Sequence, residues 1–140
     1  MYEKQLSGQP ERFVRFEENP RKFSRIAIKT NGRILLIDPG GVETVEAKGN
    51  CVLFRQASGS ELLRESLASV AEKLRPFGFV RIHRSVLVNS SFVEEIEPRA
   101  TGCYVLRIKG GREFHVSRTY KKNLQSITTL WFGTDLFHVN

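Results

Sequence analysis

The chain has 140 residues, of which 40% are hydrophobic and 26% charged, a composition typical of a single folded domain. Twenty-two Lys and Arg residues against fifteen Asp and Glu residues leave a formal net charge of +7, which suits a polyanionic partner. Three classes are excluded: no apolar run reaches the roughly 18 residues that span a bilayer, the N-terminus lacks a signal-peptide core, and two cysteines cannot build a disulfide scaffold.

The pattern along the chain predicts one domain between two flanking segments. Residues 1–23 are polar and rich in turn residues, so we expect a linker or docking arm there. The domain is expected over residues 24–132, followed by a tail over 133–140. We expect Cys51 and Cys103 to be reduced, mostly buried thiols of a cytoplasmic protein, although the sequence leaves a disulfide between them open.

Short apolar runs separated by turn residues predict β-strands from residue 25 onward. Asn31-Gly32 lies between two such runs and indicates a tight hairpin, because both turn positions need a positive φ angle. Gly110-Gly111 indicates a second hairpin, and Leu62-Leu63 a short strand before the internal helix. The other expected strands cover 25–30, 33–38, 42–47, 51–56, 79–82, 87–88, 92–96, 104–109 and 113–116.

Two segments have the periodicity of a helix. In the first, Leu67, Val70, Ala71 and Leu74 share one face, Ser66 can cap the N-terminus and Pro76 ends the run. The second is expected over 117–132, with Ser117 as its cap and an apolar stripe of Tyr120, Leu124, Ile127 and Trp131. We expect the apolar residues around Trp131 and in the tail (Trp131, Phe132, Leu136 and Phe137) to pack on the domain.

The sequence contains no pattern typical of catalysis. The nucleophile, metal-protease and phosphate-loop motifs are missing, and no histidine stands at a recognisable spacing from a nucleophile. A zinc site built from Cys51, His83, Cys103 and His115 is disfavoured, because structural zinc ligands usually come in close pairs. We therefore expect no enzyme, no cofactor, no metal and no small-molecule substrate.

Two exposed Ser and Arg pairs stand where predicted strands end. Arg84-Ser85 interrupts an apolar strand, and Ser117-Arg118 follows another and begins the C-terminal helix. Arg118, Lys121 and Lys122 in the first turns of that helix oppose its dipole, so an anion such as phosphate would stabilise them; three solvated basic residues are the alternative. Arginine is suited to bidentate contacts with guanine or phosphate.

These segments, in this order, resemble the LytTR DNA-binding domain family. The resemblance covers roughly residues 25–125 and is carried by Val45-Glu46-Ala47-Lys48-Gly49-Asn50, Arg81-Ile82-His83-Arg84-Ser85, Leu87-Val88-Asn89, Val93-Glu94-Glu95-Ile96, Gly102-Cys103-Tyr104-Val105-Leu106 and Val116-Ser117-Arg118-Thr119-Tyr120-Lys121-Lys122. It implies a mainly β, elongated fold of about ten short strands in small sheets, with one short internal helix and a C-terminal helix.

The resemblance also implies how the domain works. Members of the family bind double-stranded DNA through loops that enter successive major grooves of a bent duplex, commonly as the output half of bacterial response regulators. The base-contacting positions of the family match Asn50, Arg84 and Arg118, and neighbouring backbone-contacting positions match Lys48, Ser85, Lys121 and Lys122. A second copy is expected on an adjacent direct repeat, with no membrane partner.

Three features depart from the family pattern. Only about 23 residues precede the domain, too few for the receiver that usually stands there, and Cys51 and Val86 occupy positions where an aromatic residue is common. An alternative function therefore stays open at this point. A basic, β-rich interaction module that binds an acidic protein or membrane surface would share the same composition and charge.

Overall fold

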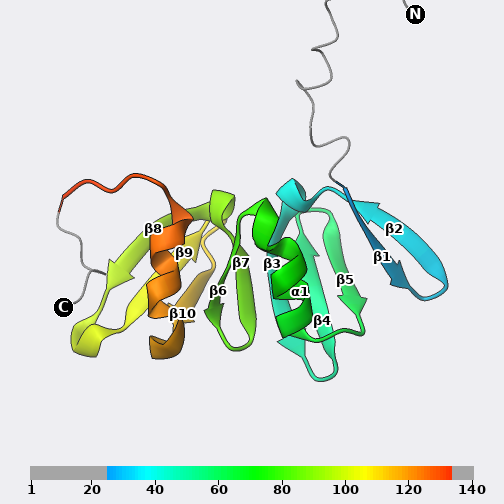
Figure 1. Ribbon diagram of the computed structural model, residues 1–140, viewed down its shortest axis with the longest axis horizontal. Coiled ribbons are helices and arrows are strands. Elements are labelled where there is room, and N and C mark those ends of the chain that lie inside the picture. Colours follow the sequence, from blue (N-terminus) through cyan, green and yellow to red (C-terminus); the bar gives the residue numbers. More distant parts are fainter. Residues whose placement is uncertain (1–24, 134–140) are drawn as a thin grey trace, which may run out of the picture.

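A computed structural model of the chain describes residues 25–133, and within this range it contains ten β-strands and one α-helix (Figure 1). The strands are β1 (Ile26–Thr30), β2 (Arg33–Ile37), β3 (Val42–Lys48), β4 (Cys51–Gln56), β5 (Gly59–Leu63), β6 (Phe79–His83), β7 (Val86–Asn89), β8 (Val93–Pro98), β9 (Tyr104–Ile108) and β10 (Glu113–Val116). The helix α1 spans Leu67–Leu74, and the 3-10 helices are η3 (Pro39–Gly41), η4 (Arg75–Phe77), η5 (Ser90–Phe92), η6 (Ala100–Gly102) and η7 (Arg118–Ile127). The expected mainly β fold of about ten short strands is confirmed.

The strands form three antiparallel sheets that follow one another along an elongated molecule. β1 and β2 form a two-stranded ribbon, the middle sheet has the order β5-β4-β3-β7-β6, and the third sheet has the order β10-β9-β8. Figure 1 shows the ribbon at one end and the third sheet at the other, with α1 in front of the middle sheet and η7 in front of the third. The connections between strands therefore gather along the two long edges.

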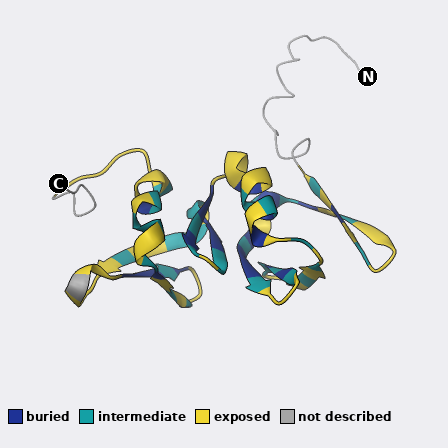
Figure 2. Ribbon diagram, turned by 60° about the horizontal axis from the view of Figure 1, so that its bottom comes forward, coloured by how far each residue is buried: buried dark blue, intermediate teal, exposed yellow. Residues whose placement is uncertain are grey.

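The β6–β7 hairpin separates two hydrophobic cores, one on each of its faces (Figure 2). Phe79 and Leu87 pack into the first core with the β1–β2 ribbon and α1. Val80, Ile82 and Val88 pack into the second core with the third sheet and η7. Side chains of a strand alternate between its faces, so one hairpin can serve both cores.

Buried Asn89 anchors the end of β7, where the hairpin leaves the middle sheet. Its Nδ2 group donates to the carbonyl oxygens of Pro39 at 3.3 Å and Val42 at 2.9 Å. Its Oδ1 atom accepts from the backbone N–H of Ser91 at 3.0 Å and from the Ser91 hydroxyl at 2.8 Å. A buried amide needs such partners, and these tie β7 to the connection between β2 and β3.

Two local signals in the sequence are confirmed. Asn31 has a φ of 50° and Gly32 a φ of 74°, as a tight turn between β1 and β2 requires. Ser66 caps α1, since its hydroxyl accepts from the backbone N–H of Ser69 at 3.1 Å. The short strand expected at Leu62-Leu63 is the end of β5.

The C-terminal helix differs from the prediction in type, in length and at its cap. It is a 3-10 helix that ends at Ile127 rather than an α-helix that reaches residue 132, and Ser117 makes no side-chain capping bond. In a helix with three residues per turn, side chains i and i+3 lie in one row. One such row, Tyr120 and Asn123, contacts Arg81 of β6, and another, Leu124 and Ile127, packs in the second core.

Two further expectations are wrong in part. Cys51 and Cys103 are reduced, but Cys51 is half-buried and Cys103 is exposed. Trp131 and Phe132 are exposed, Phe132 by 86%, because they follow the end of η7 and lie outside both cores. The remaining tail residues, and the arm expected over 1–23, lie outside the described residues.

Candidate nucleic-acid interface

Three connections lie along one long edge of the molecule, the lower edge in Figure 1. They are the β3–β4 turn, the β6–β7 turn and the junction between β10 and η7. These connections carry the seven residues predicted to contact DNA: Lys48, Asn50, Arg84, Ser85, Arg118, Lys121 and Lys122. The topology thus brings together positions as far apart in the sequence as Lys48 and Lys122.

The β3–β4 turn presents Lys48 and Asn50 at its tip, and both are exposed. Lys48 pairs with Cys51 across the two strands, so only two residues form the loop. Gly49 has a φ of +62°, a value that a side chain would strain. The tight turn leaves the ends of both side chains in solvent.

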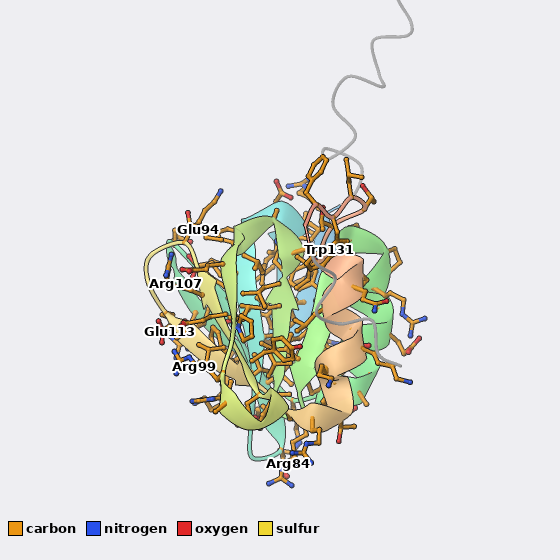
Figure 3. All side chains as sticks on the ribbon, turned by 90° about the vertical axis from the view of Figure 1, so that its left-hand side faces the viewer. Arg84, Glu94, Arg99, Arg107, Glu113 and Trp131 are labelled. Carbon is orange, nitrogen blue, oxygen red and sulfur yellow. The ribbon has the colours of Figure 1, made fainter. Side chains whose placement is uncertain are left out.

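The β6–β7 turn presents Arg84, which projects from the tip of the hairpin in Figure 3. The register shifts between Arg81 and His83, and such irregularities re-aim side chains at the ends of strands. His83 then closes the turn: its Nδ1 atom accepts from the backbone N–H of Ser85 at 3.1 Å and lies 2.9 Å from the Ser85 hydroxyl. Nδ1 is therefore an acceptor here, and Ser85, predicted to contact the DNA backbone, is half-buried against the imidazole.

The third connection presents Arg118 and Lys122, which are both exposed. Lys121 is half-buried, and its Nζ atom lies 5.9 Å from the centroid of the Tyr104 ring. The ring packs along the lysine and favours its charge. The predicted cluster of basic residues is therefore present at the start of η7, with Lys121 held more closely to the protein than Lys122.

Hydrogen bonds fix these three connections to one another. The backbone N–H of Ala47, just before Lys48, donates to the carbonyl of Ser85 at 2.9 Å. The backbone N–H of Ser117, just before Arg118, donates to the carbonyl of Ile82 at 3.0 Å. The edge is thus built on strand ends rather than on long loops, which makes its geometry precise.

Within residues 25–133, the exposed cations of this edge make no ion pair, a property that they share with Arg25, Lys29, Arg33, Arg64 and Lys109. Lys48, Arg84, Arg118 and Lys122 have no carboxylate partner in this part of the chain. By contrast, six cations away from the edge pair with glutamates: Arg55 and Arg112 with Glu46, Lys73 with Glu65, Arg75 with Glu72, Arg99 with Glu97, and Arg107 with Glu95. The positive charge of the edge is therefore available to a polyanion.

A hollow of about 510 Å³ lies between the first two connections. Asn50 and Arg84 line it together with Arg81, Glu65 and the first turn of α1. The Glu65 carboxylate accepts from the Ser69 hydroxyl at 2.9 Å and from Lys73 at 3.1 Å, and these bonds lower its pKa. The ionised Glu65 carboxylate is therefore paired with Lys73 of α1, and no ion pair joins it to Arg84.

Among residues 25–133, no group of three or more His, Cys, Asp and Glu side chains is arranged to hold a metal ion. In the same range no helix has the length and apolar character needed to cross a bilayer.

The sequence missed Arg81, whose side chain lies under the β6–β7 turn. Its guanidinium donates to the carbonyls of both His83 and Arg84. The alternation of Phe79-Val80-Arg81-Ile82-His83 showed that Arg81 stands opposite the apolar residues of one face. Nothing in that pattern indicated which backbone groups it would reach.

Comparison with known proteins agrees with the fold and with the motifs. A sequence profile of the LytTr DNA-binding domain matches residues 32–129. The sensory transduction protein LytT of Bacillus subtilis is 28% identical over 103 residues (74% of this chain and 43% of LytT), and LytT of Oceanobacillus iheyensis is 33% identical over 106 residues (74% and 43%). The transcriptional regulatory protein YpdB of Escherichia coli is 28% identical over 111 residues (79% and 46%).

A solved structure supports the same fold. The LytTr DNA-binding domain of a Bacillus cereus protein superposes with a TM-score of 0.63 at 22% identity, over 74% of this chain and 94% of that domain. The mainly β architecture of this chain is therefore that of a LytTr-type domain. The chain belongs to the LytTr DNA-binding domain family, and it spans about half the length of the curated relatives it matches.

Proposed function

We propose that this chain binds double-stranded DNA in a sequence-specific manner and serves as the DNA-binding part of a bacterial transcription regulator. One observation carries the proposal. Three strand ends, fixed to one another by hydrogen bonds, present unpaired cations and an amide along a single edge. Relatives named as sensory transduction and transcriptional regulatory proteins support the regulatory part.

Each proposed base contact has a suitable chemistry. Asn50 can pair its amide with adenine, and Arg84 and Arg118 can donate two hydrogen bonds to O6 and N7 of guanine. Lys48, Lys121 and Lys122 suit phosphates, which set position and orientation but carry no sequence. Ser85 suits a phosphate as well, and His83 holds it in the turn, with Nδ1 3.1 Å from the Ser85 backbone nitrogen and 2.9 Å from its hydroxyl.

The arrangement favours insertion of loops into successive major grooves from one side of the duplex. The three connections lie side by side on strand ends, and in the described residues no α-helix stands among them to act as a recognition helix. A bend in the duplex would bring the outer connections into contact together, so part of the specificity would come from the deformability of DNA. We further propose that two copies of the chain bind side by side on adjacent direct repeats, and that the protein acts in the cytoplasm.

Selection of binding sites from a random pool of duplex DNA tests this function. We expect an enriched sequence with repeated half-sites, and an affinity that falls steeply with salt because phosphate contacts release counterions. Equal binding to heparin, acidic peptides and DNA without a preferred sequence would contradict sequence-specific binding. That outcome would favour a basic interaction module instead.

A further inference from the structure

We propose that Arg81 is the positioning residue of the DNA edge: it aims Arg84 and couples the Arg84 turn to the Arg118 connection without contacting DNA itself. The inference rests on the proposed function, since it assigns how one of the base-reading positions is held. Arg81 lies on β6, three positions before Arg84.

The first link runs from Arg81 to the turn. Its Nε atom donates to the carbonyl oxygen of His83 at 3.3 Å, and its Nη2 atom donates to the carbonyl oxygen of Arg84 at 2.5 Å. A planar guanidinium presents these donors in a fixed fork, so two bonds to the carbonyls of consecutive residues orient that part of the turn. The Arg84 carbonyl that accepts one of these bonds belongs to the residue whose side chain is proposed to read a base, so the bond restrains where that side chain begins.

The second link runs from Arg81 to η7. The guanidinium carbon of Arg81 lies 5.4 Å from the centroid of the Tyr120 ring, and the Arg81 carbonyl accepts from Nδ2 of Asn123 at 2.9 Å. Tyr120 and Asn123 stand two and five residues after Arg118. Side chain and backbone of Arg81 thus both connect the strand behind Arg84 with the helix behind Arg118.

Arg81 is held back from the surface, unlike the predicted base-reading arginines. It is half-buried, whereas Arg84 and Arg118 are exposed. It lines both the hollow beside Asn50 and a second hollow of about 470 Å³ between α1 and η7. Within the described residues it has no carboxylate partner, so carbonyl oxygens and an aromatic ring stabilise its charge in place.

Bidentate recognition depends on such positioning. Two donors of one arginine reach O6 and N7 of a guanine together only if the side chain starts from the right place, and a site loosened by about 1 Å loses that geometry. Phosphate contacts by flexible lysines tolerate the same movement. Loss of the Arg81 fork should therefore reduce specificity more than overall affinity.

The test is the pair of variants Arg81→Lys and Arg81→Met, with Arg75→Lys, at the exposed first residue of η4, as a matched control. Each variant is measured on the selected site and on random duplex DNA over a range of salt. Because a lysine keeps the charge but lacks the fork, both variants should bind the selected site at least about fivefold more weakly. Binding to random DNA should stay within about twofold, and the salt slope should not change.

Repeated site selection supplies the second readout. We expect Arg81→Lys to lose its preference at the same base pair as Arg84→Ala, and the double variant to bind no more weakly than Arg84→Ala alone. Tyr120→Leu should weaken that preference, whereas Tyr120→Phe, which keeps the ring, should not. These two variants leave Arg81 intact, so they test the link even if Arg81→Met unfolds.

Three results would count against this assignment. If Arg81→Lys binds like the parent and Arg81→Met loses about one phosphate contact in its salt slope, Arg81 contacts DNA directly and the inference is wrong. If Arg84→Ala weakens specific binding while Arg81→Lys and Tyr120→Leu do not, the inference alone fails. If Arg84→Ala has no effect, the proposed role of Arg84 fails and the inference fails with it.

Discussion

Arg112 and Glu46 form an ion pair across the junction between the middle sheet and the third sheet. Nη2 of Arg112, in the turn between β9 and β10, lies 3.0 Å from Oε2 of Glu46 on β3. The same oxygen accepts from the Thr44 hydroxyl at 2.7 Å and from Nε of Arg55 at 3.0 Å. This buried carboxylate is thus the shared acceptor of three donors, one residue before Ala47, whose backbone N–H donates to the Ser85 carbonyl at the DNA edge.

The Glu46 carboxylate should make the stability of the fold depend on pH in acid. Burial raises its pKa, but the Thr44 hydroxyl, Arg112 and Arg55 outweigh burial and hold it below 4.5. A group whose pKa is lowered by folding stabilises the fold above its unfolded pKa and loses that contribution as pH falls through its folded value. We expect urea denaturation to give a free energy of unfolding that decreases below about pH 4.5.

Glu46→Gln identifies the source of that dependence. We expect it to lower the free energy of unfolding at pH 7 by about 2 kcal/mol, because bonds to a charged acceptor are replaced by bonds to a neutral amide. Its deficit should shrink toward pH 3, because the parent carboxylate is increasingly protonated as the pH falls. Glu94→Gln, an exposed acid in Figure 3, serves as the control, and equal deficits for Glu46→Gln at both pH values would contradict the prediction.

Arg84→Ala and Arg118→Ala should each weaken binding to a selected DNA site by about 1–3 kcal/mol and relax the preference at one base pair. The two changes should act on different base pairs, because the side chains stand on different connections. Competition binding with single-base variants of the site measures both effects. Arg64→Ala, an exposed arginine between β5 and α1, is the control. Parental affinity and preference in both variants would refute the assignment.

Lys122→Ala should weaken binding to specific and random DNA by a similar factor. If Lys122 contacts one phosphate, the salt slope should fall by about 0.9 in magnitude. Lys121→Ala should also affect both DNAs, and because its ammonium group packs over Tyr104 it should lower the thermal midpoint of unfolding as well. A change in base preference from either lysine variant would show that these residues read sequence.

Leu124→Ala should destabilise the domain and disturb the DNA edge together. Leu124 is 0% exposed in the second core, so its truncation leaves a cavity and should cost about 2–5 kcal/mol in the free energy of unfolding. Because Leu124 holds η7, specific DNA binding should weaken at temperatures where the domain is still folded. Leu130→Ala, at a position that is 65% exposed, should change stability by less than about 0.5 kcal/mol. Equal stability of the two variants would contradict this account of the core.

The parts of the fold that depend on neighbouring residues were predictable from the sequence. The Asn31-Gly32 turn and the Ser66 cap are short-range signals, in which a backbone angle or one hydrogen bond decides the outcome. The family motifs also placed Arg84 and Arg118 at strand ends, where the structure has them. Their predicted DNA contacts stay predictions.

The parts that depend on distant residues were not predictable in the same way. The apolar stripe of residues 117–132 fits an α-helix, but Asn123 bonds a carbonyl 42 residues away and the segment forms a 3-10 helix instead. The role of Arg81 has the same origin, since its partners His83, Arg84 and Tyr120 meet only when β6 and η7 pack together. A sequence pattern shows on which face of a strand a residue lies. It does not show which group of another element that residue will contact.

The two-sided packing of the β6–β7 hairpin has a consequence for how binding sites are chosen. Asn50 stands in the turn between two strands of the first core, Arg118 follows a strand of the second, and Arg84 stands at the tip of the hairpin between the cores. The intervals between these three side chains are therefore set by Val80, Ile82 and Leu87, which lie inside the protein. If the three side chains read bases as proposed, the packing of these interior residues determines how far apart the recognised bases lie. The surface side chains then determine which bases are recognised.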